Sequence, residues 1–231
     1  RQAANKIDVF TLNTARFILG GLVLLPFVWR VPLSKRGVGY ASLAGALLVA
    51  GSALQQAGMQ TTAAANASFL TGLYVVFIPI ILAVFLRQPV TRVVWVAIGI
   101  SGVGGFLLSA GGIQAFVIGD LLEILGAVLW ALHVILVGSV AREFHPIQFA
   151  SGQFLAAGLL NGIIALIFER NWVAGLEQAW MPVLYLGLFS TAVGFTLQVV
   201  GQRHAPTTDA ALILGLEAPL AAIAGYLLLS E

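Results

Sequence analysis

Residues 67–86 read ASFLTGLYVVFIPIILAVFL and hold no charged side chain. An α-helix needs about 20 apolar residues to cross a bilayer, so this run is long enough to span one. The whole chain has the same character, because 60% of its 231 residues are hydrophobic and 9% are charged. Soluble domains carry about 25% charged residues. The composition excludes a soluble enzyme, a nucleic-acid binder and a disordered chain, and it predicts an all-α integral membrane protein.

Apolar runs of this length recur along the chain and predict eight transmembrane helices in a multi-span bundle. Their predicted ranges are 10–29, 39–58, 67–86, 93–110, 121–140, 147–168, 181–200 and 208–229. The connections are short, so neighbouring helices are expected to run antiparallel with no extramembrane domain between them. The chain has no cysteine, which excludes disulfides and thiolate metal sites. We expect neither a metal nor a cofactor.

Lysine and arginine are unevenly divided between the two sets of alternate loops. Seven of the eleven lie on one side and three on the other, with one inside a span. Cytoplasmic loops carry the excess of positive charge in membrane proteins. The seven-charge side is therefore expected in the cytoplasm, and the protein in the cytoplasmic (plasma) membrane. The predicted cytoplasmic loops are 30–38, 87–92, 141–146 and 201–207.

The chain also resembles itself when it is shifted by 143 positions. Residues 51–88 then fall on 194–231 without a gap, and Gly51, Gln55 and Gly58 coincide with Gly194, Gln198 and Gly201. We infer two repeats, 1–118 and 119–231, the first without its opening helix and the second without its closing helix. Each complete repeat would have five helices, and an odd number inverts the second copy, as in many secondary transporters. The sequence thus predicts helices two to nine of a ten-helix protein.

Three stretches resemble the EamA family of the drug/metabolite transporter superfamily. They read LQQAGMQTTAAANASFLTGLY at 54–74, AVLWALH at 127–133 and LEAP at 216–219 followed by LSE at 229–231. Ser230 departs from the family pattern, in which glycine usually precedes the final glutamate. The resemblance implies ten helices, cytoplasmic termini, and export or uptake of small metabolites by alternating access.

Polar side chains inside the apolar spans are the candidate substrate-binding residues, since such groups are costly in lipid and face a cavity or another helix. Glu217, two residues before Pro219, is the strongest candidate, for binding either substrate or a proton. Tyr74 occupies the repeat position of Glu217, and Thr71 lies one turn before Tyr74. For each of them, hydrogen bonding to a neighbouring helix is the alternative.

Helix 121–140 carries Glu123, Trp130 and His133 on one face. A stripe of an acid, an indole and an imidazole suits the lining of a cavity, which we expect for Trp130 and His133; packing against another helix is the alternative for Trp130. His133 joins Glu217 as a proton-coupling candidate, because imidazole titrates near neutral pH. Glu123 lies near the end of the helix, where contact with lipid headgroups is the favoured explanation.

Gln55 and Gln198 are repeat mates, each with glycine four residues before and three after. Such amides bridge closely packed helices, and a part in the site is the alternative. Gly158 and Gly162 form a further pair of small residues suited to helix packing. The full set of predicted substrate-binding residues is Gln55, Thr71, Tyr74, Trp130, His133, Gln198 and Glu217.

The sequence favours a secondary transporter that moves a small organic metabolite or drug-like solute by alternating access. Its expected partners are that solute, the lipid bilayer and protons, with no nucleic acid; the oligomeric state stays open, a monomer included. One alternative is an intramembrane serine protease, because Gly99-Ile100-Ser101-Gly102 matches the nucleophile motif of rhomboid-type enzymes. A helix interior offers such a serine few free backbone donors for an oxyanion hole. A lipid flippase or channel is the other alternative.

Overall fold

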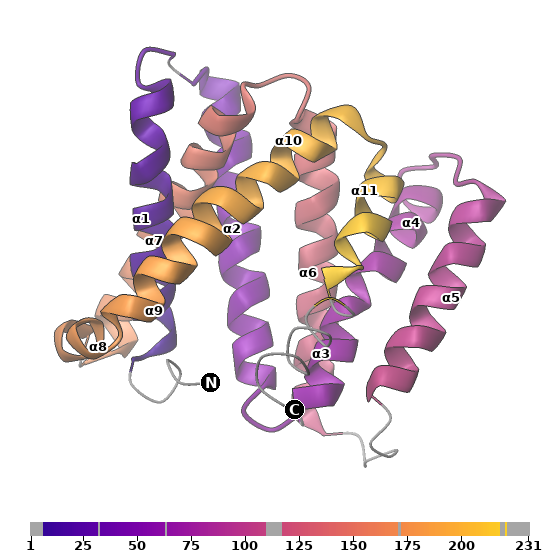
Figure 1. Ribbon diagram of the computed structural model, residues 1–231, viewed down its shortest axis with the longest axis horizontal. Coiled ribbons are helices and arrows are strands. Elements are labelled where there is room, and N and C mark those ends of the chain that lie inside the picture. The colour runs from indigo at the N-terminus through magenta and orange to yellow at the C-terminus, as the bar shows by residue number, and fades with distance from the viewer. Residues whose placement is uncertain are drawn as a thin grey trace. The chain divides into compact units, whose positions relative to one another are not determined.

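The computed structural model describes residues 7–31, 33–62, 64–109, 117–170, 172–217 and 220, and within them the only regular elements are helices (Figure 1). This agrees with the predicted all-α class. The elements are α1 (Val9–Val28), α2 (Lys35–Gly58), α3 (Ala64–Gly72), α4 (Tyr74–Val84), α5 (Arg92–Ser109), α6 (Ile118–Val140), α7 (Pro146–Phe168), α8 (Trp172–Gln178), α9 (Trp180–Tyr185), the π-helix η1 (Leu186–Phe195), α10 (Thr196–His204) and α11 (Thr207–Leu214).

Six helices among the described residues are long and apolar enough to cross a membrane. They are Val9–Val28, Lys35–Gly58, Asn66–Val84, Ile118–Val140, Pro146–Phe168 and Trp180–His204. These six confirm six of the eight predicted spans. The predicted span 93–110 corresponds to α5, whose apolar stretch Arg92–Gly104 is shorter. The predicted span 208–229 begins in α11 and continues into residues outside the described part. Pro219 lies among those residues. The number of eight transmembrane helices therefore stays a prediction.

The chain divides into two compact units, each assembled from separate stretches of sequence. Unit 1 comprises 1–53 and 136–204, and unit 2 comprises 54–135 and 205–231. The boundary falls inside α2 and inside α6. Both units therefore draw on both of the predicted repeats.

Unit 1 is built on the close antiparallel packing of α1 against α7, which lie side by side in Figure 1. Gly158 contacts Ile18 and Gly162 contacts Thr14, so residue numbers fall along one helix as they rise along the other. A Cβ atom at position 158 would stand 2.7 Å from the Cδ1 atom of Ile18. The helices can approach this closely because glycine has no side chain. The packing role predicted for Gly158 and Gly162 is thus confirmed.

The beginning of α1 is held by the side chain of Glu169, which follows α7. Its Oε1 accepts from the Phe10 backbone N–H at 2.7 Å. Its Oε2 accepts from the Thr11 backbone N–H at 2.7 Å and from the Thr11 hydroxyl at 2.6 Å. The first N–H groups of a helix have no partner within the helix, and a carboxylate also interacts favourably with the helix dipole there.

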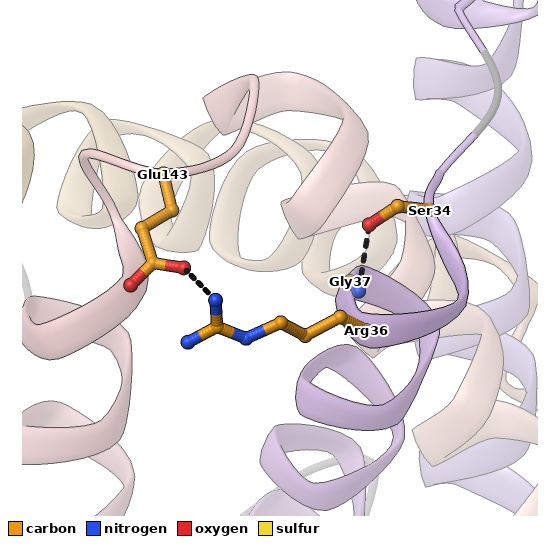
Figure 2. A network of polar contacts seen from close by, with 4 residues as sticks. All are labelled: Ser34, Arg36, Gly37 and Glu143. Atoms are coloured by element: carbon orange, nitrogen blue, oxygen red, sulfur yellow. Dashed lines mark hydrogen bonds and ion pairs between the residues drawn. The ribbon is translucent and has the colours of Figure 1, made fainter.

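Three of the predicted cytoplasmic loops meet at one end of unit 1. Arg36 Nη1 lies 3.4 Å from Glu143 Oε2, and the Ser34 hydroxyl accepts from the Gly37 N–H at 3.1 Å (Figure 2). Arg142 Nε donates to the Arg203 carbonyl at 3.1 Å. These contacts place loops 30–38, 141–146 and 201–207 together, as the predicted topology requires. Their assignment to the cytoplasm stays a prediction.

Unit 2 contains α3, α4, α5, α11, the end of α2 and the larger part of α6. Its apolar core joins α4, α6 and α11 through six buried residues: Ile78, Leu82, Ala131, Val134, Ile135 and Ala211. Its long membrane segment is interrupted at Leu73, where α3 ends and α4 begins. Leu73, at this interruption, lines the cavity that forms the candidate functional site.

Candidate functional site

Unit 2 contains a partly open cavity of about 470 Å³ between α2, α3, α4, α5 and the end of α11. Pockets for small molecules usually measure about 300–1,000 Å³, so this cavity suits a small metabolite. Four of the seven predicted substrate-binding residues line it: Gln55, Thr71, Tyr74 and Glu217. Most of the remaining lining is apolar. The structure therefore brings together polar groups that are far apart in the sequence.

Two helix interruptions face this cavity. At the first, the Leu73 N–H donates to the Leu70 carbonyl at 3.2 Å, three residues back instead of four. At the second, which follows α11, the Leu216 N–H donates to the Ile213 carbonyl at 3.1 Å in the same way. The two turns occupy equivalent positions under the 143-residue shift. Such breaks are tolerated at membrane depth where they line a cavity.

Each interruption is followed at once by a polar side chain of the site. Tyr74 is the first residue of α4, and Glu217 occupies its repeat position after the second turn. Both side chains line the cavity. Gly215, in the second turn, packs against Val75, with 3.1 Å from a Cβ built at position 215 to the Val75 Cγ2 atom. This contact places the second turn beside the start of α4.

Three polar side chains form a hydrogen-bonded series that leads from the cavity lining to Glu123. Gln55 Nε2 on α2 donates to the Thr71 hydroxyl oxygen at 3.3 Å. The Thr71 hydroxyl on α3 donates in turn to Glu123 Oε2 on α6 at 2.8 Å. Glu123 itself is 0% exposed. The expectation that Glu123 contacts lipid headgroups is therefore wrong.

Close packing of α2 against α6 explains why Glu123 is buried. A Cβ atom at Gly58 would stand 2.8 Å from Glu123 Oε1 and 2.9 Å from the Gly119 carbonyl oxygen. At Gly119 a Cβ atom would collide with the Thr62 hydroxyl. Thr62 also donates to Asp120 Oδ1 at 3.0 Å, which ties the end of α2 to the start of α6. Only two glycines facing each other allow this approach.

The other predicted site residues lie elsewhere. His133 is 1% exposed on α6 and meets the Trp130 ring edge to face, with 6.2 Å between ring centroids. Both belong to unit 2, but neither is among the residues that line the cavity. Gln198 belongs to unit 1, where its Nε2 donates to Gln202 Oε1 at 3.4 Å. Whether these three contact substrate stays untested.

In the sequence, Ser101 and Gly102 stand out only as parts of a protease motif, whereas the structure places both in the cavity lining. They lie in the middle of α5, whose backbone donors serve the helix itself. Within the described residues, no cluster of three or more His, Cys, Asp or Glu side chains could hold a metal ion. The sequence signal that could have identified this side of the cavity is the pair of glycines Gly102 and Gly104 on α5, both of which line it.

Comparison with known proteins gives a consistent result. The model of the EamA-like transporter family matches residues 1–110 and 117–231. An uncharacterized transporter of Archaeoglobus fulgidus is 30% identical over 240 residues, which cover 99% of this chain and 72% of that protein. The threonine/homoserine exporter RhtA of Escherichia coli K12 is 28% identical over 228 residues, which cover 95% and 74%. A solved crystal structure is similar to this chain with a TM-score of 0.81 and 17% sequence identity. The match covers 97% of this chain and 81% of the chain in that structure, and it shows the fold alone.

Proposed function

From the premise that this chain belongs to the EamA-like transporter family, and is a membrane transporter of small solutes and not an enzyme, we propose that it exports small amino compounds through the cavity of unit 2. The proposed substrates carry a protonated amino group and a short polar side chain. The similarity to threonine/homoserine exporters supports this class.

The charge of the cavity carries the proposal. Glu217 is the one ionisable residue with a formal charge at neutral pH among the described lining residues, which include no lysine, arginine or histidine. A carboxylate in a cavity that has no basic side chain among its described lining residues favours a cation, because opposite charges attract each other. The hydroxyls of Thr71, Tyr74 and Ser101 add sites for hydrogen bonds. An ammonium group near Glu217 would carry the opposite charge and could also donate hydrogen bonds to these hydroxyls.

Alternating access is the proposed mechanism, and two observations support it. The interrupted helices bear Tyr74 and Glu217 at equivalent positions, as expected of a site formed by two inverted repeats. The repeat mates α1 and α7 also pack antiparallel within unit 1, the relation that an in-plane twofold axis would produce. A proton gradient is the proposed energy source. Glu217 and His133 are the candidates from the sequence for carrying the proton.

The substrate class is tested by counterflow of labelled L-threonine into proteoliposomes. Ethanolamine keeps the amino group and lacks the carboxylate, whereas 3-hydroxybutyrate keeps the carboxylate and lacks the amino group. We expect ethanolamine to compete and 3-hydroxybutyrate to have little effect. Competition by the acid alone would contradict the assignment.

The role of Glu217 is tested in the same assay. Glu217→Gln removes the charge and keeps the shape, so uptake should fall sharply while the protein elutes normally from a sizing column in detergent. Glu177→Gln is the matched control, since Glu177 is an exposed carboxylate on α8. Normal L-threonine uptake by Glu217→Gln would refute the role.

A further inference from the structure

We propose that Glu123 takes up the coupling proton and that the Thr71 hydroxyl conveys the charge state of Glu123 to the cavity. This proposal rests on the proposed function, because it concerns how the same cavity binds and releases an amino compound. It adds a proton site that does not itself line the cavity. Thr71 is the connection, since it lines the cavity and also contacts Glu123.

The surroundings of Glu123 favour a group that changes protonation state. The side chain is fully buried, and among the described residues its Oε1 has no hydrogen-bond partner. Among the described residues no lysine, arginine or histidine forms an ion pair with Glu123; the ion pair that they do contain joins Arg36 and Glu143 in unit 1. A buried carboxylate without a counter-charge is costly, and protonation removes the charge. Intramembrane carboxylates of this kind serve as proton relays in transporters.

Asp120, one turn earlier on α6, provides a contrast. Its Oδ1 accepts from the Thr62 hydroxyl and its Oδ2 from the Val117 N–H, each at 3.0 Å. Both carboxylate oxygens of Asp120 therefore have a hydrogen-bond partner, whereas Oε1 of Glu123 has none among the described residues. Asp120 is therefore assigned a structural role, and Glu123 the exchangeable proton.

The hydrogen-bonding capacity of Thr71 defines how the connection works. A hydroxyl has one donor and two acceptor positions. While Glu123 is ionised it can only accept, so Thr71 must donate to it. Thr71 also accepts from Gln55, which leaves one acceptor position for a donor in the cavity. In this state the cavity is suited to the N–H groups of an ammonium.

Protonation of Glu123 on Oε2 reverses the arrangement. The carboxyl group then donates to the Thr71 oxygen, and Gln55 occupies the second acceptor position. The only direction left for the Thr71 proton is the cavity, where it faces the ammonium of a bound substrate. As the ammonium leaves, a hydronium ion from the aqueous phase loses one O–H bond and Glu123 Oε2 gains one, and no covalent bond of the substrate changes. Each transported substrate is thereby exchanged for one proton.

The charged neighbours of Glu123 are few. On α6 the nearby carboxylate is Asp120, one turn before Glu123. From α2 the facing groups are Gln55 and Gly58, and from α3 the facing group is Thr71, none of which carries charge. Tyr74 and Glu217 line the cavity that Thr71 shares. Because Glu217 would pair with the substrate, it is not required to carry the proton as well.

The first test needs no substrate. Infrared difference spectra of the reconstituted protein between acid and neutral pH should contain the C=O band of a protonated carboxyl group. This band should disappear in Glu123→Gln and remain in Asp120→Asn. In Thr71→Val, which removes the hydrogen bond and keeps the shape, the band should shift in frequency. A carboxyl band that loses no intensity in Glu123→Gln would overturn the proposal, and a Glu123 component unchanged by Thr71→Val would overturn the connection.

The second test measures coupling with labelled L-threonine as the probe. In proteoliposomes an imposed pH gradient should drive accumulation by the unaltered protein above the level reached by counterflow. Thr71→Val should lose this excess and Thr71→Ser, which restores the hydroxyl, should regain it. Gradient-driven accumulation by Glu123→Gln would overturn the proposal. If the unaltered protein does not move L-threonine at all, the proposed substrate is wrong, and the infrared test still decides the proton site.

Discussion

Glu123 on α6 lies directly against Gly58 on α2, so that a Cβ atom at position 58 would stand 2.8 Å from the Glu123 Oε1 atom. The absence of a side chain at Gly58 therefore makes room for the buried carboxylate. The Gly119 carbonyl oxygen lies almost as close, at 2.9 Å from the same point. A backbone atom cannot turn aside as a flexible side chain can, so the two helices would have to separate.

Gly58→Ala should consequently destabilise the protein, by about 1–3 kcal/mol in the range known for overpacked cores. It should also disturb the hydrogen bond between Thr71 and Glu123. Thermal stability in detergent, followed by the fraction that stays monodisperse after heating, measures the first effect. Gly39→Ala on the same helix is the control, because a Cβ there meets nothing within 4 Å. Equal stability of the two variants would show that α2 and α6 are not so closely packed.

Glu169→Ala should weaken unit 1 by removing three hydrogen bonds at the start of α1. Loss of a helix cap costs about 0.5–2 kcal/mol, and an equivalent loss is expected here. Glu169→Gln should lie between Glu169→Ala and the unaltered protein, since an amide oxygen still accepts from Thr11 or Phe10. Glu177→Ala changes an exposed glutamate on α8 and serves as control. Heating curves that coincide for all variants would contradict the capping role.

The apolar runs predicted the helices of unit 1, and the spacing of Gly158 and Gly162 predicted a close helix contact without naming its partner, because both depend on local patterns in the sequence. The same is true of four cavity residues, which stood out as polar groups within apolar spans. The burial of Glu123 could not be read in this way. It depends on Gly58 and Gly119 meeting in space, although they are 61 positions apart.

Two other features also lay beyond sequence patterns. The π-helix η1 occupies ten residues within the predicted span 181–200, and no local sequence rule separates it from an α-helix. In the structure Gly187 of η1 packs against Leu19 and Thr191 packs against Gly20. The π-helical hydrogen bonding of η1 thus occurs where η1 packs against α1. The two compact units were also not evident, since each combines stretches from both predicted repeats.

The sidedness of the loops can be tested directly because the chain has no native cysteine. Ser34→Cys and Glu143→Cys place single thiols in the loops expected to be cytoplasmic, and both positions are exposed. A membrane-impermeant maleimide should label them in inside-out vesicles and not in intact cells. Glu177→Cys, on the opposite side, should be labelled in intact cells. The reverse pattern would invert the topology derived from the positive charges.

The final prediction concerns the open side of the cavity on α5. A Cβ atom at Gly102 would meet nothing within 4 Å, yet Gly102 lines the cavity. Gly102→Leu should fill space that substrate occupies, and L-threonine uptake should fall about tenfold or more, as expected when a pocket loses its fit. Thermal stability should not fall, because the new side chain displaces no protein atom. Gly99→Leu is the matched control, since it also has open space on α5 and does not line the cavity. If both variants reduced uptake equally, the effect would come from α5 itself and the cavity would lose its assigned role.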